Sequence, residues 1–143
     1  MKWHVITTGK PSFPWTRDGV EMYVTRLQRL ANVRVTHLKS GADTAAYAKA
    51  SGDAFRLVLD ERGARMDTQT LYRQVTEWEL DGPKEIAVWI GGADGLGAEA
   101  RQAADFCLKL GELTLMHELA LLVWLEQLYR VYTLKGHLPY HRD

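Results

Sequence analysis

The 143-residue sequence has one cysteine, four prolines and no excess of charge of either sign. Its single thiol, Cys107, excludes a disulfide within the chain, so we expect a protein of a reducing compartment. The 18 basic and 18 acidic side chains give a formal net charge of zero, which provides no global electrostatic argument for nucleic-acid binding. Length and composition otherwise predict one globular domain, residues 1–143.

Long apolar runs and a targeting segment are also lacking. The most apolar run, 119–125, is followed by Glu126 and Gln127 and is far shorter than the ~20 residues that cross a bilayer. The opening residues MKWHVITTGK are too short and too polar for a signal peptide. No histidine, cysteine or carboxylate pair shows metal-ligand spacing. We therefore expect a cytoplasmic protein with no membrane association and no metal.

Strand-like and helix-like segments alternate along the chain. β-branched and apolar runs predict strands at 3–8, 33–38, 55–59 and 85–90, with 112–115 short and extended. Apolar residues at helical spacing predict helices at 20–30, 68–81 (capped by Asp67 or Thr68), 98–110 and 118–134, with 41–51 weakly helical. This alternation predicts an α/β fold in which helices flank a parallel sheet on both faces.

Two predicted strands end in glycine and polar residues. The stretch IGGADGLG, 90–97, follows one of them, and by itself it fits a tight structural turn as well as a cofactor loop. Asp60–Gly63 follows another, and by itself it fits a solvated acidic turn. Because the carboxyl ends of parallel strands share one edge of the sheet, the two segments together favour a pocket there.

Several single residues and one helix leave alternatives open. Cys107 fits a small buried hydrophobe in a helical run, and His117 fits a helix cap, a ligand or an RNA contact. The last helix has a wide apolar stripe, which favours a homodimer interface, with packing in the core of one chain as the alternative. The stripe consists of Leu121, Leu125, Leu128 and Tyr132, widened by Leu122 and Tyr129.

Seven short motifs occur in an order that is specific as a combination. They are Gly9-Lys10, Glu21-Met22-Tyr23 with Arg26-Leu27, Leu59-Asp60-Glu61 with Gly63, Ile90-Gly91-Gly92-Ala93-Asp94-Gly95-Leu96, Leu113-Thr114-Leu115 with His117, Leu125-Glu126-Gln127-Leu128-Tyr129-Arg130 and Tyr140-His141-Arg142. Over nearly its whole length the chain resembles the RlmH family of bacterial 23S rRNA pseudouridine methyltransferases, a minimal branch of the SPOUT superfamily.

The resemblance implies a fold, a cofactor and a substrate. The fold would be a SPOUT-type α/β domain with a C-terminal trefoil knot, although knots are rare in proteins. The cofactor would be S-adenosylmethionine, and the acceptor N3 of a pseudouridine in helix 69 of 23S rRNA, in the assembled ribosome. The protein would be a homodimer whose sites form between subunits.

The resemblance also implies site residues. Contacts to the cofactor would come from Leu59, Gly91, Leu110, Gly111, Glu112, Leu113, Thr114 and Leu115. The tail residues Tyr140, His141 and Arg142 would act in the partner's site. An imidazole can accept a proton near neutral pH, so His141 is the candidate general base. Arg142 would stabilise an anion or hold a phosphate, and Tyr140 would stack on a base or donate its hydroxyl.

The chain departs from the family pattern at two positions near the last helix. Met116 stands where the family usually has proline, and Leu121 where it usually has arginine. These two departures motivate one alternative, a noncatalytic or weakly active SPOUT-like protein that binds RNA or ribosomes. A second alternative is a SPOUT methyltransferase that acts on another RNA.

Overall fold

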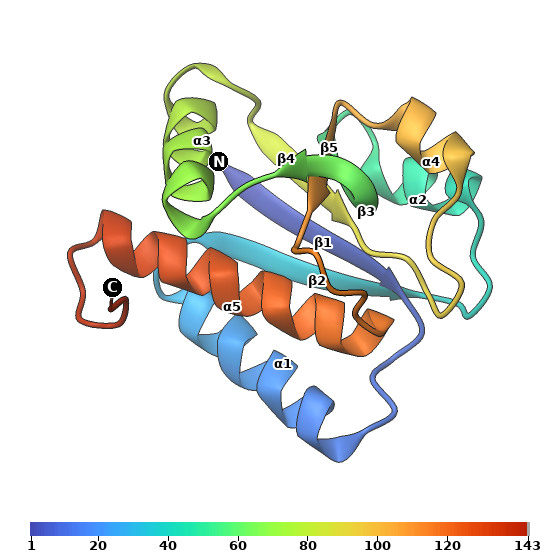
Figure 1. Cartoon of the computed structure of the whole chain (residues 1–143), viewed down its shortest axis with the longest axis horizontal. Coiled ribbons are helices and arrows are strands. Elements are labelled where there is room, and N and C mark those ends of the chain that lie inside the picture. The colour runs from blue at the N-terminus through green and yellow to red at the C-terminus, as the bar shows by residue number, and fades with distance from the viewer. Residues whose placement is uncertain (143) are drawn as a thin grey trace.

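A five-stranded sheet forms the centre of the computed structural model, which describes residues 1–142 (Figure 1). Its strands are β1 (Lys2–Thr8), β2 (Asn32–Leu38), β3 (Phe55–Arg65), β4 (Glu85–Trp89) and β5 (Phe106–Lys109). They lie in the order β2-β1-β4-β3-β5, and all neighbouring pairs are parallel. The predicted parallel α/β architecture is therefore confirmed.

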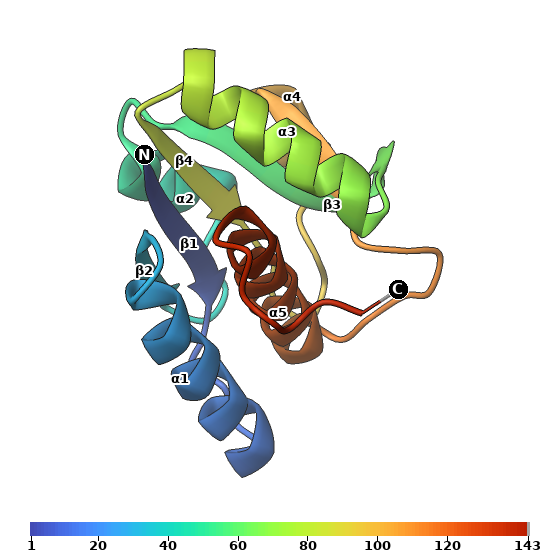
Figure 2. The same ribbon diagram turned by 90° about the vertical axis from the view of Figure 1, so that its left-hand side faces the viewer.

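Helices cover both faces of this sheet. They are α1 (Pro14–Gln28), α2 (Thr44–Ser51), α3 (Thr68–Asp81), α4 (Ala98–Ala103) and α5 (His117–Lys135). Alternate strand residues face opposite layers: Trp3 and Val5 pack with α1, α3 and α5, whereas Ile6 packs with α2 and α4. In Figure 2, α3 and α5 lie in front of the strands and α2 lies behind them. Each strand therefore carries apolar residues on both faces, as the near-continuous apolar runs predicted.

The predicted helix over 98–110 is wrong in its second half. Helix α4 ends at Ala103, and the next residues form β5 at the edge of the sheet. Asp105 ties the chain to β3 at this point. Its backbone N–H donates to the carbonyl oxygen of Arg56 at 2.9 Å, and its carboxylate accepts from the Arg56 N–H at 2.8 Å. In a short apolar run, helical and strand spacing look alike, so this contact decides the outcome.

Helix α1 begins at Pro14, earlier than the predicted residue 20, because its N-terminus is capped by a distant residue. Its own N-cap residue, Phe13, makes no side-chain cap bond. Instead, the Glu118 carboxylate on α5 accepts the N–H groups of Ser12 and Phe13 at 2.9 and 3.3 Å. It also accepts the hydroxyl hydrogen of Thr16 at 2.6 Å. A negative charge at this position favours the helix and ties α1 to α5.

The apolar stripe of the last helix lies in the core of the single chain. Its four central residues are at most 7% exposed: Leu121, Leu125, Leu128 and Tyr132. Helix α5 also packs closely on α1, since a Cβ atom added to Gly19 would lie 2.8 Å from Cδ1 of Leu122. Core packing therefore accounts for these four residues, whereas Leu122 and Tyr129, which widen the stripe, are half-buried, and the use of the stripe as a dimer interface stays a prediction. A homodimer needs a separate argument.

Replacing Glu118 by glutamine should lower the free energy of unfolding at pH 7 by about 2 kcal/mol. Burial alone would raise the pKa of Glu118, but the hydrogen bonds from Ser12, Thr16 and Phe13 outweigh it and lower the pKa to about 2. The carboxylate therefore stabilises the fold fully above its ordinary pKa of 4.5, and this stability is lost as pH falls towards 2.

Urea unfolding between pH 7 and pH 3 measures this effect. The stability gap between wild type and Glu118→Gln should stay constant down to about pH 5 and shrink below it. Glu77→Gln, at an exposed position on α3, is the matched control and should show a small gap. If the stability difference between wild type and Glu118→Gln were the same at pH 3 and pH 7, the low pKa assigned to Glu118 would be contradicted.

Candidate functional site

A cavity of about 410 Å³ lies at the carboxyl ends of β4 and β5 and beside residues 59–62 of β3. This volume is within the range of small-molecule sites, and the place is where open α/β sheets bind ligands. Seven of the predicted cofactor residues line it: Leu59, Gly91, Leu110, Gly111, Leu113, Thr114 and Leu115. The structure therefore brings together in one cavity residues that lie far apart in the sequence.

An irregularity between β3 and β5 creates one wall of the cavity. Leu108 on β5 is the register partner of Leu59 and again of Ala64, so the intervening residues leave the regular ladder. Strand β3 thus continues to residue 65 instead of ending at the predicted residue 59. Residues 60–62 of this irregularity line the cavity, and they belong to β3 and not to a turn, although Glu61 and Arg62 are exposed as the solvated-turn interpretation expected.

Charged groups of both signs line this wall. The Asp60 carboxylate accepts from the backbone N–H of Arg62 at 2.8 Å and from Nη1 of Arg101 at 3.3 Å. The side chain of Asp60 is 8% exposed, against 27% for Arg101. Since Lys109 also borders the cavity, a zwitterionic ligand would find partners there for both of its charges.

The glycine-rich turn lines the same cavity through residues 91–96. A Cβ atom on Gly91 would lie 2.7 Å from the carbonyl carbon of Gly95 and 2.8 Å from the nitrogen of Leu96. Gly95 has a φ of +70°, and its N–H donates to the Gly92 carbonyl oxygen at 2.9 Å. The stretch is therefore both a tight turn and a cavity wall, which reconciles the two interpretations of its sequence.

The loop between β5 and α5 closes the cavity, and it is irregular where the sequence predicted an extended segment at 112–115. Glu112, the eighth predicted cofactor residue, does not line the cavity. Its carboxylate pairs with Arg65 at 2.8 Å and Lys109 at 2.9 Å. The hydrogen bond from Lys109 and then the charge of Arg65 lower the pKa of Glu112. Glu112 therefore ties the loop to β3 and β5 through these two ion pairs.

His117 is the first residue of α5, and it lines the cavity. The N-cap of the helix is Met116, whose side chain makes no cap bond, so of the alternatives for His117 the helix cap is excluded. The ligand and RNA-contact alternatives for His117 stay open.

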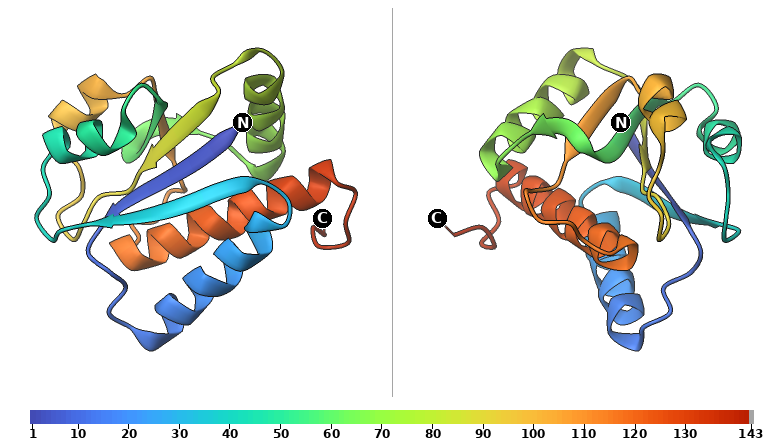
Figure 3. Two further views of the ribbon diagram at one scale, coloured as in Figure 1. Left: turned by 180° about the vertical axis from the view of Figure 1, so that it is seen from behind. Right: turned by 45° about the vertical axis from the view of Figure 1, so that its right-hand side comes forward.

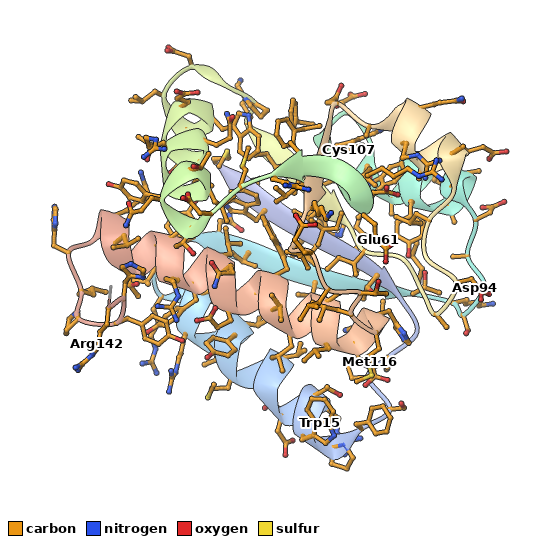
Figure 4. The ribbon with its side chains drawn as sticks, in the orientation of Figure 1. Trp15, Glu61, Asp94, Cys107, Met116 and Arg142 are labelled. Atoms are coloured by element: carbon orange, nitrogen blue, oxygen red, sulfur yellow. The ribbon has the colours of Figure 1, made fainter. Side chains whose placement is uncertain are left out.

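The tail that contains Tyr140, His141 and Arg142 docks on α5 away from the cavity. The Tyr140 hydroxyl donates to Oε1 of Glu126 at 3.0 Å and lies 3.0 Å from the Tyr23 hydroxyl. Figure 4 shows Arg142 on the opposite side of the molecule from Asp94 and Met116. None of the three tail residues lines the cavity. Asp143 lies outside the described residues.

This tail is held by residues of α5. The sequence analysis named these residues only as part of a motif. The Tyr140 ring packs edge-on against Tyr129, with ring centroids 4.8 Å apart, and the Arg130 guanidinium lies 4.8 Å from its centroid. Burial, then the hydrogen bonds with Tyr23 and Glu126, raise the pKa of the Tyr140 hydroxyl. The one local signal was the i,i+4 spacing of Glu126 and Arg130, which form an ion pair at 2.5 Å.

Other kinds of site have little support in the structure. Residues 1–142 contain no group of three or more histidine, cysteine or carboxylate side chains that could hold a metal ion. Within the same residues, no helix has the length and apolarity needed to span a membrane. Cys107 lies on β5 rather than on the predicted helix, and burial, then the charge of Asp60, raise the pKa of its thiol. A raised pKa lowers the fraction of the reactive thiolate form.

Sequence comparison relates the whole chain to one family. Residues 1–141 match a family model described as "Predicted SPOUT methyltransferase". The chain is 42% identical over 142 residues to ribosomal RNA large subunit methyltransferase H of Thermus thermophilus, with 99% of both chains covered. It is 38% identical over 145 residues to the protein of the same name from Deinococcus radiodurans, again with 99% of each covered.

Solved structures share the fold at low sequence identity. A probable methyltransferase from Bordetella pertussis aligns with a TM-score of 0.58 at 11% identity, over 92% of this chain and 96% of that chain. A Legionella pneumophila structure in complex with the bound cofactor SAM aligns with a TM-score of 0.52 at 13% identity, over 91% of this chain and 66% of that chain. These likenesses show a common fold.

Replacing Gly91 by alanine should destabilise the protein by about 2 kcal/mol, because its Cβ atom would collide with backbone. Gly111 lines the same cavity, but a Cβ atom there would have no heavy atom within 4 Å. Gly111→Ala is therefore the matched control and should leave stability nearly unchanged. Urea unfolding of both variants measures the difference, and equal effects would contradict the close approach at Gly91.

Proposed function

The chain belongs to the RlmH family of SPOUT methyltransferases, and on that premise we propose that it is an S-adenosylmethionine-dependent methyltransferase of large-subunit ribosomal RNA. The observation that carries the proposal is the cavity at the strand ends, lined by seven residues that the family resemblance assigns to the cofactor. Full-length identity to proteins named for this activity supports it.

The residues of the cavity suit the chemistry of S-adenosylmethionine. That molecule carries a sulfonium, an ammonium and a carboxylate beside an apolar-faced adenine. The cavity supplies carboxylates from Asp60, Glu61 and Asp94 and cations from Arg101 and Lys109. Apolar contact for the adenine would come from leucine side chains, and hydrogen bonds from the backbone of the β5–α5 loop. The sulfonium supplies an already activated methyl group, so the protein mainly has to align donor and acceptor.

We propose N3 of a pseudouridine in helix 69 of 23S rRNA, in the assembled ribosome, as the acceptor. The support for this specific atom is the family resemblance and the tail motif that ends the described chain. A neutral protein can read such a substrate by shape and local contacts, since the zero net charge gives little general attraction to RNA. Methylation needs loss of the N3 proton, whose pKa lies above neutrality.

We propose that the active form is a homodimer in which the tail of one subunit serves the cavity of the other. At about 1.5 Å per residue, Glu126, which binds Tyr140, lies roughly 14 Å along the helix axis from His117 at the cavity. Within one chain the tail groups are therefore too far away to act on a ligand in the cavity. A two-fold axis near the middle of α5 would place each tail beside the partner's cavity.

Three further expectations belong to the same proposal. Residues 1–143 would form one domain that unfolds in a single cooperative transition. The segments around 91–97 and 110–116 would form the trefoil knot that the family resemblance implies. The ribosomal substrate and the single cysteine would place the protein in the cytoplasm.

Two departures from the family pattern motivate the alternative of a noncatalytic RNA- or ribosome-binding protein. Leu121 is 2% exposed and belongs to the core, so an arginine at this position would have to be buried. Met116 is 41% exposed at the start of α5. Arg101 and Lys109 supply positive charge at the cavity in place of the missing arginine, which favours the catalytic proposal.

Ribosomal RNA from a deletion strain tests the activity. Mass spectrometry should show loss of one methyl group from helix 69, and the purified protein with S-adenosylmethionine should restore it on isolated ribosomes. Calorimetry should show that the protein binds S-adenosylmethionine. If helix 69 keeps its methyl group while another RNA loses one, the acceptor is different. If the cofactor does not bind even with ribosomes present, the noncatalytic alternative holds.

Mixed dimers test the shared site. Leu115→Trp should fill the cavity, and His141→Ala should disable the tail, so each variant alone should be inactive. A mixed dimer would have one site with both changes and one intact site, so co-refolded mixtures should recover about a quarter of wild-type activity. Light scattering must show a dimer, and circular dichroism must show that both variants fold. Failure to recover activity would contradict a site shared between subunits.

A further inference from the structure

The tail histidine is held by a group that can only donate hydrogen bonds. Nη1 of Arg130 lies 3.2 Å from Nδ1 of His141, in the geometry of a hydrogen bond. A guanidinium has five N–H donors and no acceptor, and it stays charged in proteins. Nδ1 of His141 must therefore accept, so the neutral imidazole carries its hydrogen on Nε2.

The orientation of Arg130 is fixed by its other contacts. Oε1 of Glu126 accepts from both Nε and Nη2 of Arg130, at 3.2 and 2.5 Å, so two N–H groups of the guanidinium converge on one carboxylate oxygen. Oε2 of Glu126 accepts from Nε2 of Gln127 at 2.7 Å. The Tyr140 ring packs against the guanidinium, and its hydroxyl is donated to the same carboxylate. Glu126 and Tyr140 therefore hold Arg130 in the position from which it reaches His141.

We infer that Arg130 is a positioning residue that holds His141 in the Nε2–H tautomer, so that His141 serves the proposed reaction as a hydrogen-bond donor and not as the general base. This inference rests on the proposed function and on the placement of the tail in the partner's site. It also assigns Tyr140 a structural role, because its hydroxyl hydrogen is already committed to Glu126.

All atoms and electrons of the methyl transfer can be accounted for without a general base from the protein. The N3 proton of the pseudouridine leaves to solvent, and the electron pair of N3 forms the new bond to the methyl carbon. The pair of the broken carbon–sulfur bond stays on sulfur, which becomes a neutral thioether. While N3 is deprotonated, negative charge spreads onto the neighbouring carbonyl oxygens. Nε2–H of His141 would stabilise that charge, as donors in an oxyanion hole do.

Replacing His141 by residues with a side-chain amide distinguishes a role as hydrogen-bond donor from a role as general base. The side-chain amide nitrogen of glutamine reaches roughly the position of Nε2 and can donate, but it cannot accept a proton at neutral pH. His141→Gln should keep single-turnover methyl transfer within about 10-fold of wild type, whereas His141→Ala should lose about 10²- to 10³-fold. The shorter His141→Asn should resemble His141→Ala. Calorimetry on each variant must show unchanged affinity for S-adenosylmethionine.

The outcomes of this experiment are distinct. Activity of His141→Gln as low as that of His141→Ala would overturn the donor role and favour a base. Full activity of His141→Ala would remove His141 from the reaction and overturn the inference. Absence of methyl transfer by the wild-type protein would instead refute the proposed function, and the tautomer would still be open to direct measurement.

Nitrogen-15 NMR of the histidine rings measures the tautomer without any substrate. His141 in the wild-type protein should give the shift pattern of the Nε2–H form, and Arg130→Met should convert it to a mixture of tautomers. Arg26→Met is the matched control, because this guanidinium lies 5.8 Å from the Tyr129 ring centroid in the same aromatic cluster. The control should leave the His141 pattern unchanged. An Nδ1–H pattern in the wild type would contradict the inference.

Discussion

The length and stiffness of α5 constrain everything else in this structure. The first turn of the helix borders the cavity with His117, and its middle binds the tail through Glu126 and Arg130. The helix is held to the rest of the fold near both of its ends: Glu118 caps α1, and Tyr132 accepts a hydrogen bond from Trp3 at 2.7 Å. Figure 3 shows the helix crossing the molecule with the C-terminal segment at its far end. A helix fixed in this way cannot bend to bring its own tail to its own cavity, and this rigidity is the physical argument for the proposed shared site.

Local sequence signals predicted those parts of the fold that depend on local chemistry. β-branched runs located four strands, and Asp67 caps α3 through the N–H of Thr70 at 2.7 Å, as proposed from its position. Long-range contacts decided the parts that were missed. Asp105 draws the chain into β5 through Arg56, and Glu118 starts α1 from another helix. No window of a few residues contains both partners of such a contact.

The candidate site likewise has parts that the sequence predicted and parts that only the structure shows. Glycine and polar residues at two strand ends predicted a cavity because parallel strands end at a common edge, and that argument needs only the order of the strands. The register break between Leu59 and Ala64 was not predictable, since it depends on which residues of β5 pair with them. The packing of the tail on α5 could not be predicted from the sequence either. The spacing of Glu126 and Arg130 predicts an ion pair on a helix, but it does not show that Tyr140 and His141 complete the cluster.

Leu121 stands where the family resemblance implies an arginine, and the structure gives a physical reason why leucine suits this position. The position faces the core, where an unpaired guanidinium would be costly and a leucine is stable. At the cavity, Arg101 is paired with Asp60, and Lys109 with Glu112, so each cation there is oriented by a carboxylate. A carboxylate ligand that enters the cavity can bind either cation while the existing pairs stay formed, because each cationic side chain has more than one donor. The cavity therefore does not depend on a cation from position 121, and the leucine contributes packing that holds the head of α5 in place.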